Sequence, residues 1–337
     1  MSERVGGGGP PTRSFGEVSP ERASTGDRAK ADGAKPPAQK MTGATRVIVA
    51  LSMAVLALTA GIDAQLFTLS KDEITRWTSE NPYERFPDGR PKVPDWLLER
   101  TRGLSAEEVL AVLPGKGYRN QFANGFQVLH PGQKLVGRAF TVQFMPVRPD
   151  LDAVVNANAK ALGVGRMNNQ VAIDMLQPGD VLVVDLFGMD ENGTIVGDNL
   201  FYYIMKGARG AGLVVDGAIR DLEGIRNMAM PAYFRTAHPT AIGNVMLTGI
   251  NVPVRIGKAT VMPGDVVLGD EEGVFFIPPQ LVKPVVEAAE AQQARDEWIK
   301  KQFDTGKYKS SEIYGRPSDP QLLKEMEEYI KSRTQRK

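Results

Sequence analysis

The 337-residue chain contains no cysteine and only two histidines, His130 and His238. Without cysteine it cannot form a disulfide, a thiolate zinc site, an iron–sulfur ligand set or a cysteine nucleophile. Two histidines are too few for a multi-histidine metal cage, so any metal must be held mainly by oxygen atoms. Oxygen ligands favour hard cations such as magnesium or manganese.

The chain also lacks an excess of charge of one sign, because 41 Lys and Arg residues balance 40 Asp and Glu residues. This balance argues against a protein whose main task is to coat nucleic acid or an anionic membrane, so no nucleic-acid partner is expected. Hydrophobic residues make up 42% of the chain and charged residues 24%, which is typical of a globular protein.

The N-terminal part has few large apolar side chains before residue 46, with Phe15 as its single aromatic and Val5 and Val18 as its large aliphatic residues. We expect residues 1–45 to be a disordered leader, since they cannot bury enough apolar surface to offset their ordering entropy. Arg46, an uncharged run and Ala64 then have the layout of a secretory signal peptide, assigned to residues 46–64. Met41 is an alternative start of translation, and residues 1–45 then belong partly to upstream sequence.

The uncharged run covers residues 47–62, which is shorter than the roughly 20 residues that span a bilayer comfortably. The signal predicts a periplasmic or secreted protein with no stable membrane span after cleavage. The alternatives are an uncleaved signal that anchors the protein in the membrane, or a buried helix.

The rest of the chain divides into three parts. Residues 65–130 predict a helical collar, in which Ser105 and Glu108 have the spacing of a capping box. Residues 131–283 alternate short apolar strands with helices and predict a layered α/β domain. Strands are expected at 135–144, 181–185, 213–215, 232–234, 266–268 and 274–277, and helices at 168–176, 199–206 and 222–228. Residues 284–337 predict a helical C-terminal extension.

One turn occurs twice in this domain. Gln177-Pro-Gly-Asp180 and Met262-Pro-Gly-Asp265 each precede an expected strand. Pro followed by Gly suits the central positions of a type II turn, because Gly accepts a positive φ angle. The repetition indicates shared turn chemistry and not a duplicated domain.

Familiar catalytic signatures are absent: the sequence has no G-x-S-x-G motif and no Walker A motif. Gly207, Gly210 and Gly212 precede the expected strand at 213–215, whereas the glycines of a Rossmann fingerprint follow a strand. We interpret them as a helix end and a tight entry into the strand.

The informative segment is the end of the strand at 213–215. Asp216-Gly217 breaks the apolar run, and Arg220-Asp221 leads into a helix, a position where sites of α/β proteins gather. The Arg220 guanidinium can grip a carboxylate with two hydrogen bonds, and Asp221 can anchor a hard cation. From spacing alone, Asp221 is equally well explained as a helix N-cap and Arg220 as a solvated surface charge.

The segment Asp216-Gly-Ala-Ile-Arg-Asp221, preceded by Gly-Ala-Gly-Leu-Val-Val, closely resembles the core motif of the RraA-like family. This family includes the 4-hydroxy-4-methyl-2-oxoglutarate and 4-carboxy-4-hydroxy-2-oxoadipate aldolases. Similar blocks occur in the same order at 137–142, 178–185, 197–198 and 263–274. The resemblance covers roughly residues 100–290.

The resemblance implies an αββα-type layered fold, assembled as a homotrimer or a hexamer made of two trimers. It also implies a metal-dependent (class II) aldolase that binds a divalent cation, usually Mg²⁺, and cleaves a 4-hydroxy-2-oxo acid to release pyruvate. Decarboxylation of oxaloacetate often accompanies this activity. The partner of the protein is then a small 2-oxo acid.

The site residues follow from the same resemblance. Arg220 matches the arginine that holds the substrate carboxylate, and Asp221 the aspartate that binds the metal. The stretch Gly197-Asp198-Asn199-Leu200 matches a helix start whose N–H groups bind a carboxylate, with Asp198 supporting the metal. From Asp198 to Asp221 is 23 positions, one more than expected for the aldolases.

Three further residues keep open roles. Asp270 and Glu272 match an acidic run of the family but are equally explained by turn chemistry. His238 follows an expected strand and is interpreted as a structural histidine or a pocket residue. The competing function is a non-catalytic regulatory or binding protein, since the family also contains regulators that inhibit ribonuclease E.

Overall fold

The computed structural model describes residues 68–161, 163–165 and 168–335. The leader at 1–45, the alternative start at Met41 and the signal peptide at 46–64 lie outside these residues and stay predictions. Within the described part of the chain, no helix combines the length and the apolar character needed to cross a membrane.

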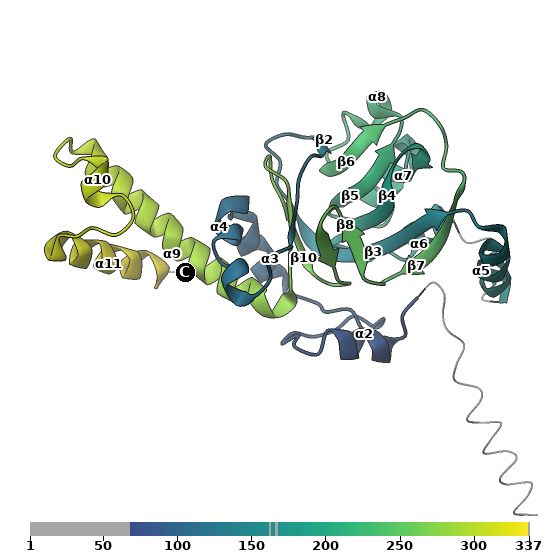
Figure 1. The fold of residues 1–337 in the computed structure, drawn as a ribbon, viewed down its shortest axis with the longest axis horizontal. Helices are drawn as coiled ribbons and strands as arrows, with labels where there is room; N and C mark the ends of the chain where they lie inside the picture. The colour runs from purple at the N-terminus through teal and green to yellow at the C-terminus, as the bar shows by residue number, and fades with distance from the viewer. Residues whose placement is uncertain (1–67, 162, 166–167, 336–337) are drawn as a thin grey trace, which may run out of the picture. The chain divides into compact units, whose positions relative to one another are not determined.

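One mixed sheet dominates the described residues and confirms the expected α/β class (Figure 1). Its strand order is β1-β11-β10-β3-β4-β5-β6-β2, with β7 paired to β3 beside this path. The strands are β1 (Phe122–Ala123), β2 (Gln127–Val128), β3 (Leu135–Pro146), β4 (Asp180–Thr194), β5 (Gly212–Ile219), β6 (Ala232–Ala237), β7 (Val245–Ile250), β10 (Val266–Gly269) and β11 (Val274–Ile277).

The centre of the sheet is parallel. Strands β3, β4, β5 and β6 pair in this order in parallel register, so their carboxyl ends meet at one edge of the sheet. Every residue of β5 is buried, as expected for a parallel strand that is covered on both faces. We call the two ends of these strands the amino edge and the carboxyl edge.

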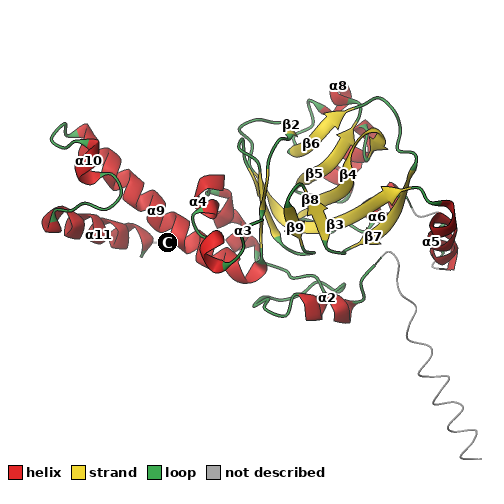
Figure 2. Ribbon diagram, in the orientation of Figure 1, coloured by secondary structure: helices red, strands yellow, loops and turns green. Residues whose placement is uncertain are grey.

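Helices cover one face of the sheet and a small hairpin covers the other (Figure 2). The helical face carries α5 (Pro149–Ala161), α6 (Asn169–Asp174), α7 (Asp198–Tyr202), the π-helical turn η2 (Tyr203–Gly207) and α8 (Leu222–Ile225). The hairpin pairs β8 (Val254–Ile256) with β9 (Ala259–Val261). The side chains that alternate along β3 to β6 therefore form two separate apolar clusters, one against the helices and one against the hairpin.

The collar supplies α2 (Lys71–Trp77), α3 (Asp95–Arg102), α4 (Ala106–Leu110) and η1 (Pro114–Lys116), and its residues also form the short strands β1 and β2. The capping box is confirmed, since Ser105 and Glu108 exchange both hydrogen bonds at the start of α4. Collar side chains such as Leu97, Val109 and Leu113 pack with Val136 and Phe275 of the sheet.

The C-terminal extension begins at α9 (Pro279–Asp304) and continues with α10 (Ser310–Ile313) and α11 (Pro320–Thr334). The first half of α9 joins the apolar cluster of the collar through Val282, Val285 and Val286. Its second half pairs with α11 around Trp298 and Met326. The two halves of α9 therefore serve two different cores.

Two tryptophans of the collar are exposed and do not pack in its interior. The exposed fractions are 46% for Trp77 and 55% for Trp96. Trp96 lies at the start of α3, where the Arg100 guanidinium carbon is 5.8 Å from its ring centroid. The interior positions of this helix are taken by Leu97 and Leu98 instead.

Candidate active site

The carboxyl edge of the sheet brings together three segments that are distant in sequence. The N–H of Arg220 donates to the carbonyl of Val196 at 3.0 Å, which ties the end of β5 to the segment before α7. The N–H of His238 donates to the carbonyl of Ile219 at 3.0 Å, which places the end of β6 beside the same point. This edge is where ligands bind in open α/β sheets.

Arg220 and Asp221 lie against each other, as the sequence predicts. The distance from Arg220 Nε to Asp221 Oδ2 is 3.5 Å, and the exposed fractions of the two side chains are 38% and 39%. The terminal guanidinium nitrogens of Arg220 hold no hydrogen bond within the described residues. They retain the paired donors that a carboxylate ligand requires.

Asp221 occupies the N-cap position of α8, but its side chain does not cap that helix. Its backbone is left-handed, with φ of 60° and ψ of 39°, which is uncommon for a residue other than glycine. The carboxylate points instead toward α7, where Oδ2 accepts a 3.4 Å hydrogen bond from the N–H of Asp198. The expected N-cap position of Asp221 is therefore confirmed, but its side chain does not make the capping hydrogen bond.

Gly197 is the point of closest approach between the two segments. A Cβ atom at this position would lie 2.2 Å from Asp221 Oδ2 and 2.9 Å from Arg220 Nε. The backbone of Gly197 is extended, with φ of −112°, so a larger residue would meet no backbone strain but would displace the side chains of Asp221 and Arg220. Glycine is needed here for close packing.

The start of α7 differs in one respect from the expectation of a free carboxylate cradle. The N–H of Asp198 already donates to Asp221, and the N–H of Asn199 donates to Asp198 Oδ1 at 2.6 Å. The chain's own carboxylates therefore occupy the positive end of this helix. Leu200 is half-buried and packs at the margin of the apolar cluster under the helices.

The segment between Asp198 and Asp221 contains an irregular helical turn. After Tyr202 the helix continues as the π-helical turn η2, in which the N–H of Ala208 donates to the carbonyl of Tyr203 at 2.9 Å. A π-helical turn accommodates one residue more than an α-helical turn, and such turns are frequent at functional sites. This turn lies between Asp198 and Asp221, ahead of β5.

The donor set at this edge suits a hard cation that keeps part of its hydration. Asp198 and Asp221 supply carboxylate oxygens, which are the ligands that Mg²⁺ prefers. Among the residues that the structure describes, no group of three or more His, Asp or Glu side chains is arranged to hold a metal ion. Mg²⁺ is commonly bound by one or two carboxylates, with water and substrate completing its shell, so the residues fit such an ion.

His238 lies next to Arg220 in the strand register but its ring is used locally. Its Nδ1 is 2.9 Å from Thr240 Oγ1, and the N–H of Thr240 donates to Nδ1 at 3.3 Å. In the contact with the Thr240 N–H, Nδ1 is the hydrogen-bond acceptor. These contacts shape the loop after β6 and favour the structural interpretation.

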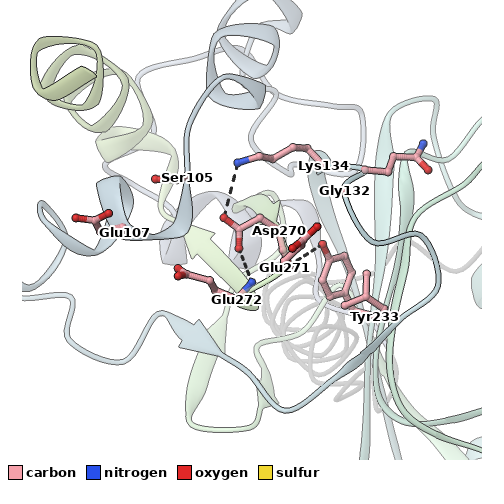
Figure 3. Close-up of a pocket in the computed structure, with 10 residues that line it drawn as sticks. Ser105, Glu107, Gly132, Lys134, Tyr233, Asp270, Glu271 and Glu272 are labelled. Carbon is pink, nitrogen blue, oxygen red and sulfur yellow. Dashed lines mark hydrogen bonds and ion pairs between the residues drawn. The ribbon is translucent and has the colours of Figure 1, made fainter. Parts of the chain in front are cut away.

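Asp270 and Glu272 lie away from the Arg220–Asp221 pair. They line a cavity of about 330 Å³ together with Lys134 and Tyr233, which stand at the starts of β3 and β6 and therefore at the amino edge (Figure 3). Asp270 Oδ2 accepts from the N–H of Ala106 at 2.8 Å, and Oδ1 accepts from the N–H of Glu272 at 3.0 Å. The Asp270 carboxylate thus holds the start of α4 and the turn at 270–272.

The first aspartate of the motif, Asp216, also has a structural role. It is 4% exposed and accepts a hydrogen bond from Arg235 Nε at 2.6 Å and from the N–H of Gly257 at 3.0 Å. Asp216 therefore holds the β8–β9 hairpin against the sheet. Only Arg220 and Asp221 at the end of the motif face the carboxyl edge.

Sequence reasoning missed a fully buried arginine of the collar. Arg90 Nη1 donates to Asp180 Oδ1 at 2.9 Å, and Arg90 Nε donates to Asp88 at 2.8 Å. Asp180 was expected only as a turn residue, and Asp88 and Arg90 flank a Gly in a turn-forming stretch. No sequence signal connects them, since 90 positions separate Arg90 from Asp180.

Comparison with known proteins identifies the class to which this fold and site belong. A family model described as RraA-like (Aldolase/RraA) matches residues 108–276. The chain belongs to the RraA-like family. The solved structure of RraAS2 from Streptomyces coelicolor, titled an unusual member of the RNase ES inhibitor RraA protein family, is 27% identical with a TM-score of 0.54. That match covers 63% of this chain and all (100%) of the other.

An uncharacterized protein from Pseudomonas syringae has a similar structure, with a TM-score of 0.52 and 25% identity over 64% of this chain and 96% of that one. Among curated proteins, one from Halalkalibacterium halodurans is named "Putative 4-hydroxy-4-methyl-2-oxoglutarate aldolase" and is 39% identical over 121 residues, or 36% of this chain. The match spans only 56% of that protein. The chain therefore spans little more than half the length of this curated relative.

Proposed function

We propose that this protein is a carbon–carbon lyase that cleaves a 4-hydroxy-2-oxo acid and releases pyruvate with the help of a divalent cation. The observation that carries the proposal is the pairing of Arg220 with Asp221 at the carboxyl edge, against Gly197 and Asp198. The names of aldolase relatives support the same reaction class.

Arg220 has the role of substrate anchor in this proposal. Its guanidinium retains free terminal nitrogens and is 38% exposed, so it can grip the carboxylate next to the keto group with two parallel hydrogen bonds. Holding that carboxylate fixes the plane of the keto acid and orients the bond to be cleaved. The contact with Asp221 limits the rotation of the arginine.

Asp221 and Asp198 are the residues proposed to hold the cation, which is Mg²⁺ or Mn²⁺. A divalent cation bound there supplies positive charge that stabilises the negative charge developing on the keto oxygen. Asp221 faces this site because its left-handed backbone directs the carboxylate away from α8 and toward α7. Asp198 comes from the other segment, so both segments must be in place together.

A non-catalytic binding protein is the second candidate, favoured by the likeness to RraAS2. Arg220 and Asp221 argue for the enzyme, because a protein that only binds a partner does not need a spare guanidinium beside a strained aspartate. In either case we expect assembly as a trimer or a dimer of trimers, which light scattering during gel filtration measures directly.

Pyruvate release separates the two candidates. The purified chain is incubated with 4-hydroxy-4-methyl-2-oxoglutarate or with oxaloacetate, in Mg²⁺ or in excess chelator. The lyase proposal predicts pyruvate from the hydroxy acid in Mg²⁺ and a large loss with chelator. Folded protein that releases no pyruvate under either condition contradicts the proposal and leaves the binding protein as the better account.

A further inference from the structure

The two Pro-Gly-Asp turns have the same internal geometry. Gly179 has φ of 83° and Gly264 has φ of 87°, as the type II turn predicts. Asp180 Oδ2 accepts the N–H of Gln177 at 2.8 Å, and Asp265 Oδ2 accepts the N–H of Met262 at 2.8 Å. Each turn therefore leaves one carboxylate oxygen, Oδ1, for another partner.

In the first turn that partner is a guanidinium between aromatic rings. Arg90 Nη1 donates to Asp180 Oδ1 at 2.9 Å, and both side chains are 0% exposed. The Arg90 guanidinium carbon lies 4.9 Å from the ring centroid of Phe86 and 5.0 Å from that of Phe140. This arrangement combines an ion pair with cation–π contacts.

In the second turn the corresponding oxygen has no such partner. Asp265 is 2% exposed, and the hydrogen bond given for its side chain within the described residues is the one that Oδ2 accepts from the Met262 N–H, with no Lys, Arg or His paired to it. Burial raises the pKa of Asp265 to about 7, because no cationic group compensates for the lost hydration. A buried carboxylate without a counter-ion is costly, and a cationic ligand removes that cost.

Asp265 lines a cavity of about 400 Å³ at the junction of α2, the β9–β10 turn and the start of α9. Trp77 and Tyr118 supply aromatic walls, and Glu80 adds a second carboxylate, which accepts a 3.1 Å hydrogen bond from the neutral amide of Gln280. Among the described residues that line this cavity, none is Lys, Arg or His. Aromatic walls and uncompensated carboxylates are the chemistry that recognises an organic cation.

We propose that this cavity binds an organic cation of the guanidinium class, with Asp265 as its counter-ion and Trp77 and Tyr118 as its walls. The occupied turn at Asp180 provides the template for the group that the empty turn accepts. The site is separate from the Arg220–Asp221 pair, so the proposal does not depend on the lyase reaction. A free guanidine and an arginine side chain of a polypeptide present the same group.

Isothermal titration with two matched probes tests the proposal. Arginine amide carries the guanidinium, and citrulline amide replaces it with an uncharged urea of the same shape. We expect arginine amide to bind and citrulline amide to bind at least about tenfold more weakly, since a charge-assisted hydrogen bond is lost. Equal binding of the two probes contradicts the proposal.

The Asp265→Asn variant locates the binding. Asparagine can still accept the Met262 N–H with its side-chain oxygen, so the turn is retained, and circular dichroism checks the fold. We expect Asp265→Asn to weaken arginine amide binding at least about tenfold, whereas Asp174→Asn, an exposed change in α6, leaves it unchanged. Unchanged binding by folded Asp265→Asn overturns the assignment.

The pH dependence gives an independent readout. A cation prefers the ionised carboxylate, so wild-type affinity is expected to rise between pH 6 and pH 8 because the Asp265 pKa is about 7. Glu80 and Tyr118 are the other titratable groups lining the cavity, and a Glu80→Gln variant should keep the same pH profile. A flat profile in the wild type contradicts the proposal.

A capped Gly-Arg-Gly peptide distinguishes the two sources of the cation. Binding of the peptide as tight as that of arginine amide shows that the cavity admits an arginine within a polypeptide. Binding of arginine amide alone indicates a free small guanidine. Failure of both probes to bind overturns the guanidinium assignment.

Discussion

The two edges of the parallel sheet use their charged side chains in opposite ways. At the amino edge, Arg90 and Asp180 are completely buried and joined by a 2.9 Å hydrogen bond. At the carboxyl edge, Arg220 and Asp221 are 38% and 39% exposed, and their contact is 3.5 Å long. The buried pair holds parts of the protein together, although Arg90 Nη2 is buried without a hydrogen-bond partner among the described residues. The partly exposed charges at the carboxyl edge are accessible to a ligand.

The backbone does not follow this division. The positive φ angles at Gly179 and Gly264 of the amino-edge turns fall on glycine, which adopts them without strain. Positive φ angles also fall on Asp221 at the carboxyl edge and on Arg209 at the amino edge, where the Arg209 carbonyl accepts a hydrogen bond from the Gly179 N–H. A left-handed backbone on a residue other than glycine therefore occurs at both edges, and Asp221 combines it with a partly exposed carboxylate.

Removing the buried arginine is expected to have the largest effect on stability. Arg90→Met leaves Asp180 buried without its counter-ion, so the free energy of unfolding should fall by about 3–5 kcal/mol. Urea unfolding followed by circular dichroism measures this change. Pyruvate release per folded molecule should stay the same, because Arg90 belongs to the amino edge.

The matched control is Arg148→Met, which breaks the Arg148–Asp150 pair. These side chains are 74% and 66% exposed, so no measurable change in stability is expected. If the two variants lose the same stability, the contrast between buried and exposed charge is wrong. If Arg90→Met abolishes activity in folded protein, the separation of the two edges is wrong.

Arg220→Lys should lower kcat/KM by roughly 10- to 100-fold, because an ammonium cannot make the two parallel hydrogen bonds of a guanidinium. Thermal stability should be retained, since Arg220 is partly exposed and its one ion pair is long. Steady-state kinetics with the hydroxy acid checks the first expectation. Full activity in this variant removes Arg220 from the substrate carboxylate.

Gly197→Ala is expected to have a smaller effect that is confined to the site. The new methyl group would meet Asp221 and Arg220, whose side chains can rotate away, so activity should fall about tenfold. The melting temperature should change little. Gly243→Ala is the control, since no atom lies within 4 Å of its added Cβ. Equal activity in the two variants places the site elsewhere.

Much of the parallel sheet could be predicted from the sequence, because its strands are continuous apolar runs bounded by Gly, Pro and Asp turns. The expected runs at 181–185 and 213–215 lie within β4 and β5. The short strands β1 and β2 could not be predicted in this way, since two residues are too few to show a period. The hairpin of β8 and β9 was missed for the same reason.

The location of the candidate site could be predicted, but its local geometry could not. Arg220 and Asp221 follow a buried strand, which identifies the carboxyl edge. Asp221 has a left-handed backbone and contacts Asp198, which lies 23 positions earlier in the chain. Local sequence preferences around Asp221 contain no information about such a distant segment, so this geometry could not be predicted. The buried position of Arg90 could not be predicted, because an arginine among turn residues is usually exposed to solvent.

The most direct test of the lyase proposal is the initial rate of pyruvate formation from 4-hydroxy-4-methyl-2-oxoglutarate as Mg²⁺ is titrated into wild type and Asp221→Asn. Asparagine tolerates the left-handed backbone but removes the carboxylate charge, so the fold is expected to persist. The proposal predicts a saturable rise in rate for the wild type, and a rate at least about 100-fold lower with no response to Mg²⁺ for the variant. A variant that responds to Mg²⁺ like the wild type would contradict it.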